Sequence, residues 1–190
     1  CVTGDKSPPT DAVGSDEANS LDASPPTGPA RAKRPSSRTV WGVARWPLET
    51  AFVLRLAFVL VAKRGDPLAG DELFYSNQAF ELTRGKWYLW PNTLLQSFVG
   101  HPTAAHPPLT STMLAPVAGL TGAAPLALRL AMVLLGVVVV LLIGRLALEI
   151  AGPRASTAAA GLAAVAAPLV LSDGSVMSET PSIVVLLGAT

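Results

Sequence analysis

The chain has 190 residues, of which 50% are hydrophobic and only 14% are charged, and its mean hydropathy is +0.45. Ordinary globular domains carry about 25% charged residues, so this composition argues against a soluble domain. The net charge of +1 also argues against nucleic-acid binding, which requires a concentrated basic surface. The composition therefore indicates a membrane protein without a nucleic-acid partner.

The beginning of the chain is polar. Residues 1–30 contain two Pro-Pro pairs, five acidic residues and almost no large apolar side chain. Such a composition cannot bury enough surface to offset the entropy of the chain. Residues 31–45 then carry five basic residues and no acid, as does the cytoplasmic flank of a membrane span. We therefore expect residues 1–40 to be a disordered cytoplasmic tail.

From both ends of the sequence, we expect the chain to be a fragment of a longer protein. The chain begins with Cys1 rather than Met, and it stops inside the apolar run of residues 183–190. A lipoprotein that is processed at Cys1 is the alternative, but the basic cluster would then have to be exported. With one cysteine, the chain cannot form an internal disulfide, so cysteine usage does not report the redox compartment.

Four apolar segments are predicted to cross the membrane within residues 41–190. A span needs about 20 apolar residues. The first segment is shorter than this and carries Glu49 and Arg55. The second segment has full length. The third is rich in alanine, which permits close contact between helices, and the fourth stops with the sequence. The spans are residues 46–62, 125–148, 155–171 and 181–190. They predict an all-α polytopic membrane protein.

Residues 107–122 decide the predicted topology. They are apolar, but a short segment with an internal proline, Pro116, fits a re-entrant or interfacial helix better than a span. If they do not span, Arg145 and Arg154 lie in the cytoplasm with the basic tail, as the positive-inside rule favours. If they do span, both arginines face outward. We therefore expect a cytoplasmic N-terminus and an external loop, residues 63–124, that carries interfacial helices.

Two adjacent acids are candidates for catalysis. Gly70-Asp71-Glu72 begins a predicted helix that ends at Arg84-Gly85, where a basic last turn precedes a glycine. Acids in a first turn interact favourably with the helix dipole, and Asp is a good N-cap, so both can be purely structural. The alternative is that a carboxylate at the membrane surface acts as a general base.

Two histidines in the same loop are further candidates. His101 and His106 are five residues apart and do not share a helix face, so their spacing is only weakly typical of a metal site. Ordinary interfacial histidines are the simpler interpretation. The two prolines that follow His106 fix a rigid start to the next helix, which can aim the imidazole at a site.

Two ionisable residues further along the chain are also ambiguous. Glu179 precedes Pro181 and is typical of the first turn of a helix, and Asp173 competes with it for any acidic role. Arg129 lies four residues into a predicted span, where it is costly unless it reaches an anion or extends to the interface.

The order and spacing of these residues resemble the membrane glycosyltransferases of the C-type (GT-C) fold. The nearest branch contains the protein O-mannosyltransferases and the transferase that adds aminoarabinose to lipid A. The resemblance covers about residues 45–190, the N-terminal third of a typical member. It is carried by Gly70-Asp71-Glu72, Tyr75, Ala79, Gly85, His106-Pro107-Pro108-Leu109, Ala127-Leu128-Arg129-Leu130, Gly136, Gly144-Arg145, Pro168 and Met177-Ser178-Glu179.

The resemblance implies transfer of a sugar from a polyprenyl-phosphate carrier to an external protein, glycan or lipid acceptor, with inversion. Asp71 matches the acidic position that deprotonates the acceptor hydroxyl. Glu72 and Glu179, the latter an Asp in many relatives, are expected to shape the site, orient the acceptor or hold a divalent metal ion. His106 is expected to contribute to substrate binding, and Arg129 is a candidate for binding the leaving phosphate. A nucleotide-binding loop is not expected.

Two other classes of function remain open. A transporter or channel segment is one alternative, in which Arg55 and Arg129 would mark an ion path. The other is an inactive, truncated membrane fragment, because four helices alone cannot complete the site of a glycosyltransferase.

Overall fold

The computed structural model describes residues 37–90 and 101–190. Most of the predicted tail, residues 1–40, lies outside these ranges. The described residues are mostly helical and contain no β-strand, apart from one isolated bridge between Leu89 and Pro102. This confirms the all-α class. The helices are α1 (Ser37–Phe58), a π-helical turn η1 (Val59–Lys63), α2 (Asp71–Thr83), α4 (Pro108–Thr121), α5 (Pro125–Val165), α6 (Ala167–Asp173) and α7 (Glu179–Gly188).

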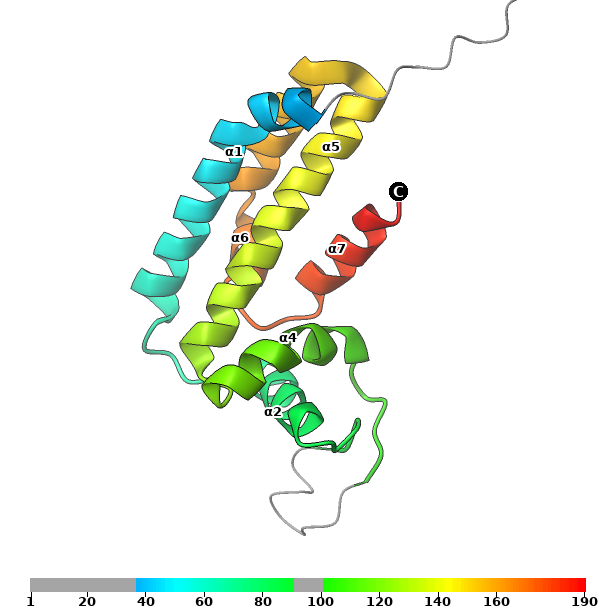
Figure 1. Ribbon diagram of the computed structural model, residues 1–190. Helices are drawn as coiled ribbons and strands as arrows, with labels where there is room; N and C mark the ends of the chain where they lie inside the picture. Colours follow the sequence, from blue (N-terminus) through cyan, green and yellow to red (C-terminus); the bar gives the residue numbers. More distant parts are fainter. Residues whose placement is uncertain (1–36, 91–100) are drawn as a thin grey trace, which may run out of the picture. The chain divides into compact units, whose positions relative to one another are not determined.

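The long helix α5 is bent back on itself at Gly152. This residue has φ +83° and ψ −174°, a conformation that favours glycine, and Pro153 follows it. The two arms, residues 125–151 and 153–165, then run side by side (Figure 1). The Ser156 hydroxyl donates to the Gly144 carbonyl at 2.7 Å across the arms. The break lies in the connection predicted between the second and third spans.

A second interruption falls inside the predicted third span, residues 155–171. Ala166 adopts φ −62° and ψ 111°, so that α5 ends at Val165 and α6 begins at Ala167. The cause is Pro168, which has no N–H to donate to the Ala164 carbonyl one turn earlier. The predicted span therefore consists of two helical segments, the end of α5 and α6.

One described helix, α5, is long and apolar enough to cross a membrane, by length and composition only. The fourth predicted segment forms the shorter apolar helix α7. The number of spans and their orientation therefore stay predictions.

Helix α1 packs along α5 through small side chains (Figure 1). The cluster at this contact is formed mainly by alanines, which let the helix backbones approach closely. Gly161 contributes in the same way, because a Cβ there would press on the Trp46 ring at 3.1 Å. The buried members of the cluster are Ala51, Val140, Ala160, Ala163 and Ala164.

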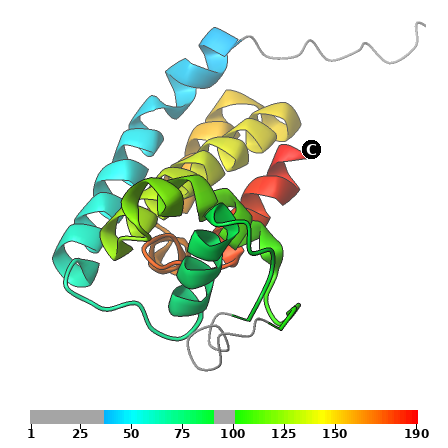
Figure 2. The same ribbon diagram turned by 60° about the horizontal axis from the view of Figure 1, so that its bottom comes forward.

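Helices α2 and α4 pack on each other beside the N-terminal end of α5 (Figure 2). The 14 residues of α4 extend about 21 Å at 1.5 Å per residue, less than the roughly 30 Å hydrocarbon core of a bilayer. A helix of this length does not cross a membrane by itself. The aromatic and aliphatic core of this layer consists of Phe74, Tyr75, Ala79, Leu114, Ala118, Leu128, Met132 and Val176.

Candidate functional site

Asp71 is the exposed carboxylate at the start of α2. The chain turns into the helix at Gly70, whose φ of +55° favours glycine, and Gly70 rather than Asp71 holds the N-cap position. The Asp71 side chain is 59% exposed, and its Oδ1 lies 3.2 Å from Nε2 of His106. Asp71 thus reaches solvent while one of its oxygens is held by an imidazole.

His106 lies between the two helices of the layer. Its ring stacks on Phe74, with 4.0 Å between the ring centroids, and it meets the edge of Tyr75 at 5.4 Å. Pro107 is the N-cap of α4 and Pro108 its first residue, so the two prolines fix the chain directly after the imidazole. His106 therefore joins the start of α4 to the start of α2, and its ring is held by the aromatic contacts.

Glu72 points away from Asp71 and is buried. Its Oε2 accepts a hydrogen bond from Arg129 at 2.9 Å, and its Oε1 accepts one from the backbone N–H of Val176 at 3.0 Å. Consecutive residues of a helix are about 100° apart around its axis, which explains why neighbours with the same chemistry face different surroundings. Glu72 fixes α2 against α5 and against the connection that leads to α7.

Arg129 is also buried, and it meets the anion that its position in an apolar helix requires. Besides Glu72, its guanidinium donates to the backbone carbonyls of Lys63 and Asp66. The last carbonyls of a helix have no partner within the helix, so Arg129 caps the end of η1. We call Arg129, Glu72 and these two carbonyls the Arg129 centre.

Glu179 is the first residue of α7, and its side chain is exposed. It follows Val176 closely, and Glu72 holds the backbone of Val176. Glu179 therefore lies at the end of α7 that is near α2. It makes no hydrogen bond or ion pair with another described residue, so the structure does not join it to Asp71 or His106.

A second buried ion pair links Arg55 to Asp173. Arg55 is fully buried, and its Nε lies 2.6 Å from Oδ2 of Asp173. Its terminal nitrogens donate to the carbonyls of Ala164, at 2.8 Å, Ala163, at 3.3 Å, and Ala51, at 3.4 Å. The Ala164 carbonyl is the one that Pro168 leaves without a helical donor. The Arg55 guanidinium thus replaces a missing backbone hydrogen bond.

The carboxylate of Asp173 has further neighbours. Thr180 donates its hydroxyl to Oδ1 at 2.6 Å. The carboxylate also occupies the space that a side chain at Gly136 would need. We call Arg55, Asp173, Thr180 and the carbonyls of Ala163 and Ala164 the Arg55 centre. The sequence signals for it were Pro168, which frees a carbonyl, and Gly136, which leaves room inside an otherwise bulky helix.

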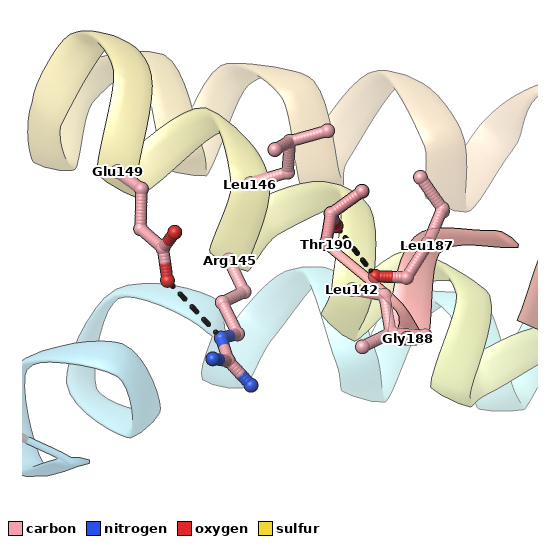
Figure 3. Close-up of a pocket in the computed structure, with 7 residues that line it drawn as sticks. All are labelled: Leu142, Arg145, Leu146, Glu149, Leu187, Gly188 and Thr190. Carbon is pink, nitrogen blue, oxygen red and sulfur yellow. Dashed lines mark hydrogen bonds and ion pairs between the residues drawn. The ribbon is translucent and has the colours of Figure 1, made fainter. Parts of the chain in front are cut away.

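Two hollows lie on either side of the Gly152 bend of α5 along the chain. One is lined by Trp46, Arg154, Thr157, Ala158, Gly161 and Leu162. The other is lined by residues of α5 and α7, with Arg145 paired to Glu149 at its edge (Figure 3). Neither of these hollows includes a residue that was predicted to belong to the catalytic site.

The described part of the chain contains no group of three His, Cys, Asp or Glu side chains that could hold a metal ion. Asp71 and His106 by themselves offer two ligands. What the site offers is one solvent-exposed carboxylate, positioned by an imidazole beside an aromatic cluster. No family model, curated protein or solved structure matches this chain.

Proposed function

We propose that this chain is the N-terminal part of a multi-pass cell-membrane glycosyltransferase of the C-type fold. It transfers a sugar from a polyprenyl-phosphate carrier to a protein, glycan or lipid acceptor on the external side. The observation that carries the proposal is the difference between two adjacent acids. Asp71 is exposed and bound to His106, whereas both oxygens of Glu72 are occupied inside the protein.

Asp71 acts as the general base in the proposed reaction. Its carboxylate takes the proton of the acceptor hydroxyl while the hydroxyl oxygen attacks the anomeric carbon. The bond between that carbon and the carrier phosphate breaks, and the phosphate leaves with the electron pair. Because attack and departure occur on opposite faces, the configuration inverts. His106 holds one oxygen of Asp71, which leaves the other directed at the acceptor.

The remaining predicted residues have supporting roles in this proposal. Glu72 and Arg129 are positioning residues, since their charged groups bind each other and fix the start of α2. For Arg129 to bind the carrier phosphate, its guanidinium would have to leave Glu72 and two carbonyls. Glu179 is exposed at the same end of the helices, where it can orient the acceptor.

No observation favours the transporter interpretation. It depended on Arg55 and Arg129 as free charges along an ion path, and each arginine instead binds one carboxylate together with backbone carbonyls, three for Arg55 and two for Arg129. A truncated, inactive fragment is distinguished from an enzyme by the activity test below, when the test is carried out on the protein as its gene encodes it.

The proposed orientation places α2 and α4 outside and the Gly152 turn in the cytoplasm. Single cysteines at the exposed positions Ala104 and Ala151 test it, in a background without other cysteines. An impermeant thiol reagent added to intact cells should label Ala104→Cys and spare Ala151→Cys until the membrane is opened. Labelling of Ala151→Cys in intact cells would contradict the orientation.

The function is tested by Asp71→Asn, which keeps the size of the side chain and removes the proton-accepting charge. General-base catalysis contributes about 10²–10⁴-fold, so sugar transfer in membranes should fall at least about 100-fold at matched protein levels. Asp66→Asn is the matched control, because the Asp66 side chain is an exposed acid in the same loop that pairs with Lys63, and the substitution leaves the backbone carbonyl that Arg129 binds in place. Transfer by Asp71→Asn at the wild-type rate would leave Asp71 as a first-turn acid and would refute the proposed mechanism.

A further inference from the structure

The hollow between α1 and the second arm of α5 has one apolar wall and one cationic edge. We propose that it binds an anionic phospholipid, with the lipid phosphate on the Arg154 guanidinium and an acyl chain along Trp46, Ala158 and Leu162. This inference rests on the membrane placement proposed above, but it is independent of the sugar-transfer reaction.

The apolar wall includes a close contact between the backbone of Gly161 and the ring of Trp46. Trp46 lies so near Gly161 that a Cβ at that position would meet the indole at 3.1 Å. Trp46 stays 55% exposed and Leu162 72% exposed, so both leave apolar surface accessible at the hollow that they line. A tryptophan with one apolar face and a polar N–H suits the headgroup region of a bilayer.

The cationic edge is distinguished by the charges around it. Arg45 pairs with Glu49 at 2.9 Å, and Arg145 pairs with Glu149 at 3.3 Å. Arg154 is exposed at the same end of the helices, and it has no acidic partner among the described residues. The hollow itself is lined by no acid. The charge of Arg154 is therefore free to bind an anion. A guanidinium can bind two phosphate oxygens at once.

The combination of the two sides selects a lipid rather than a soluble anion. Free phosphate would use Arg154 alone and would leave the apolar wall exposed. A phospholipid covers both, because its phosphate and acyl chain are joined in the same order as Arg154 and Leu162. The sequence also places five basic residues in the segment 31–45 directly before Trp46. Basic segments next to a membrane favour anionic over zwitterionic lipids, by about 1 kcal/mol for each charge.

The test is native mass spectrometry of the full-length protein in detergent, which counts bound lipid on folded molecules. Phosphatidylglycerol, phosphatidylcholine with the same chains, and inorganic phosphate are added separately. We expect phosphatidylglycerol to bind more tightly than phosphatidylcholine, and Arg154→Gln to weaken phosphatidylglycerol binding about fivefold. Arg145→Gln, which removes an exposed but paired arginine at the same end, should change it much less.

A second variant tests the apolar wall. Ala158→Phe fills the hollow from an exposed position and should weaken binding of the lipid, whereas Ala151→Phe, exposed but outside the hollow, should not. Equal phosphatidylglycerol binding by wild type and Arg154→Gln would overturn the proposal. So would displacement of the bound lipid by inorganic phosphate alone, which would show an anion site without a lipid. Sugar transfer is not measured, so failure here leaves the proposed enzyme activity untouched.

Discussion

The Arg55 centre and the Arg129 centre each bind a buried arginine within an apolar helix. Each places a buried guanidinium against one carboxylate and several backbone carbonyls, which include two at the break between α5 and α6 for Arg55 and two at and just beyond the end of η1 for Arg129. They differ in position. The Arg55 centre lies where α1 contacts the second arm of α5, whereas the Arg129 centre lies beside the loop that leads into α2.

The comparison shows that a charged residue in an apolar helix can be structural when the backbone supplies part of its partners. A buried arginine needs acceptors for five N–H groups, and a carboxylate offers only some of them. Carbonyls near helix ends and breaks supply further acceptors, but not all of them, because Nε of Arg129 is buried without a partner among the described residues. The charge and the break therefore stabilise each other, and neither by itself would indicate an ion path or a substrate site.

The largest effect is expected from Arg55→Gln. The substitution leaves Asp173 as an unpaired buried charge, which typically costs about 3–5 kcal/mol. Thermal unfolding in detergent should show a correspondingly large fall in midpoint, and Asp173→Asn added to it should recover part of the loss. Arg64→Gln, at an exposed position just after η1, is the control and should change stability by less than about 0.5 kcal/mol. An unchanged midpoint for Arg55→Gln would contradict the buried pair.

A smaller loss is expected from Arg129→Gln. Glu72 keeps its hydrogen bond from Val176, and the freed carbonyls of Lys63 and Asp66 lie next to an exposed loop where water can reach them. The cost should be about 2–3 kcal/mol, in the range for hydrogen bonds to charged groups. Limited proteolysis supplies a second measurement, since cleavage within residues 64–70 should increase. Equal losses for Arg55→Gln and Arg129→Gln would remove the distinction between the centres.

Gly136→Ala tests the space around Asp173 rather than its charge. The added methyl group would overlap the carboxylate, and overpacking of this kind costs about 1–3 kcal/mol. Because both changes act on Asp173, the double variant with Arg55→Gln should lose less stability than the two single losses added together. Gly65→Ala, whose Cβ meets nothing within 4 Å, is the control. Strict additivity of the double variant would place Gly136 outside the Arg55 centre.

The smallest effect is expected from Ser111→Ala, which sets the scale for a neutral hydrogen bond of similar burial. The Ser111 hydroxyl donates to Oε1 of Gln78 at 2.8 Å and joins α4 to α2. Its loss should cost about 1 kcal/mol, measured by the same unfolding experiment. A loss as large as that of Arg129→Gln would mean that charge contributes little to the Arg129 centre.

Local rules predicted much of the helical layout. Glycine before two acids marked the start of α2 at Asp71, and two prolines marked the start of α4 at Pro108. The connection left between the predicted spans 125–148 and 155–171 contains the turn within α5 at Gly152. These signals act over a few residues, so they can be read without knowing what packs against them.

Long-range pairs could not be predicted in the same way. Glu72 and Asp71 have the same chemistry and adjacent positions, and only the packing of α2 against α5 makes one buried and the other exposed. The partner of Arg55 lies 118 residues away, and nothing near Arg55 in the sequence identifies it. The residues of the candidate site were therefore predicted as a set. The sequence did not show that Asp71 is exposed and that Glu72 is a buried residue bound by Arg129.

The spacing of the two ion pairs has a consequence for synthesis of the chain. Glu72 is made 57 residues before Arg129, so this arginine finds its carboxylate already present. Arg55 is made 118 residues before Asp173, and at about 5–20 residues per second it waits roughly 6–24 s for its counter-ion. In the membrane placement that we propose, residues 46–62 cannot settle among their neighbours during this interval. A cysteine at Ala51, which is fully buried one turn before Arg55, should therefore react with a water-soluble thiol reagent in chains arrested before residue 173, and should be protected in chains arrested well beyond Thr180.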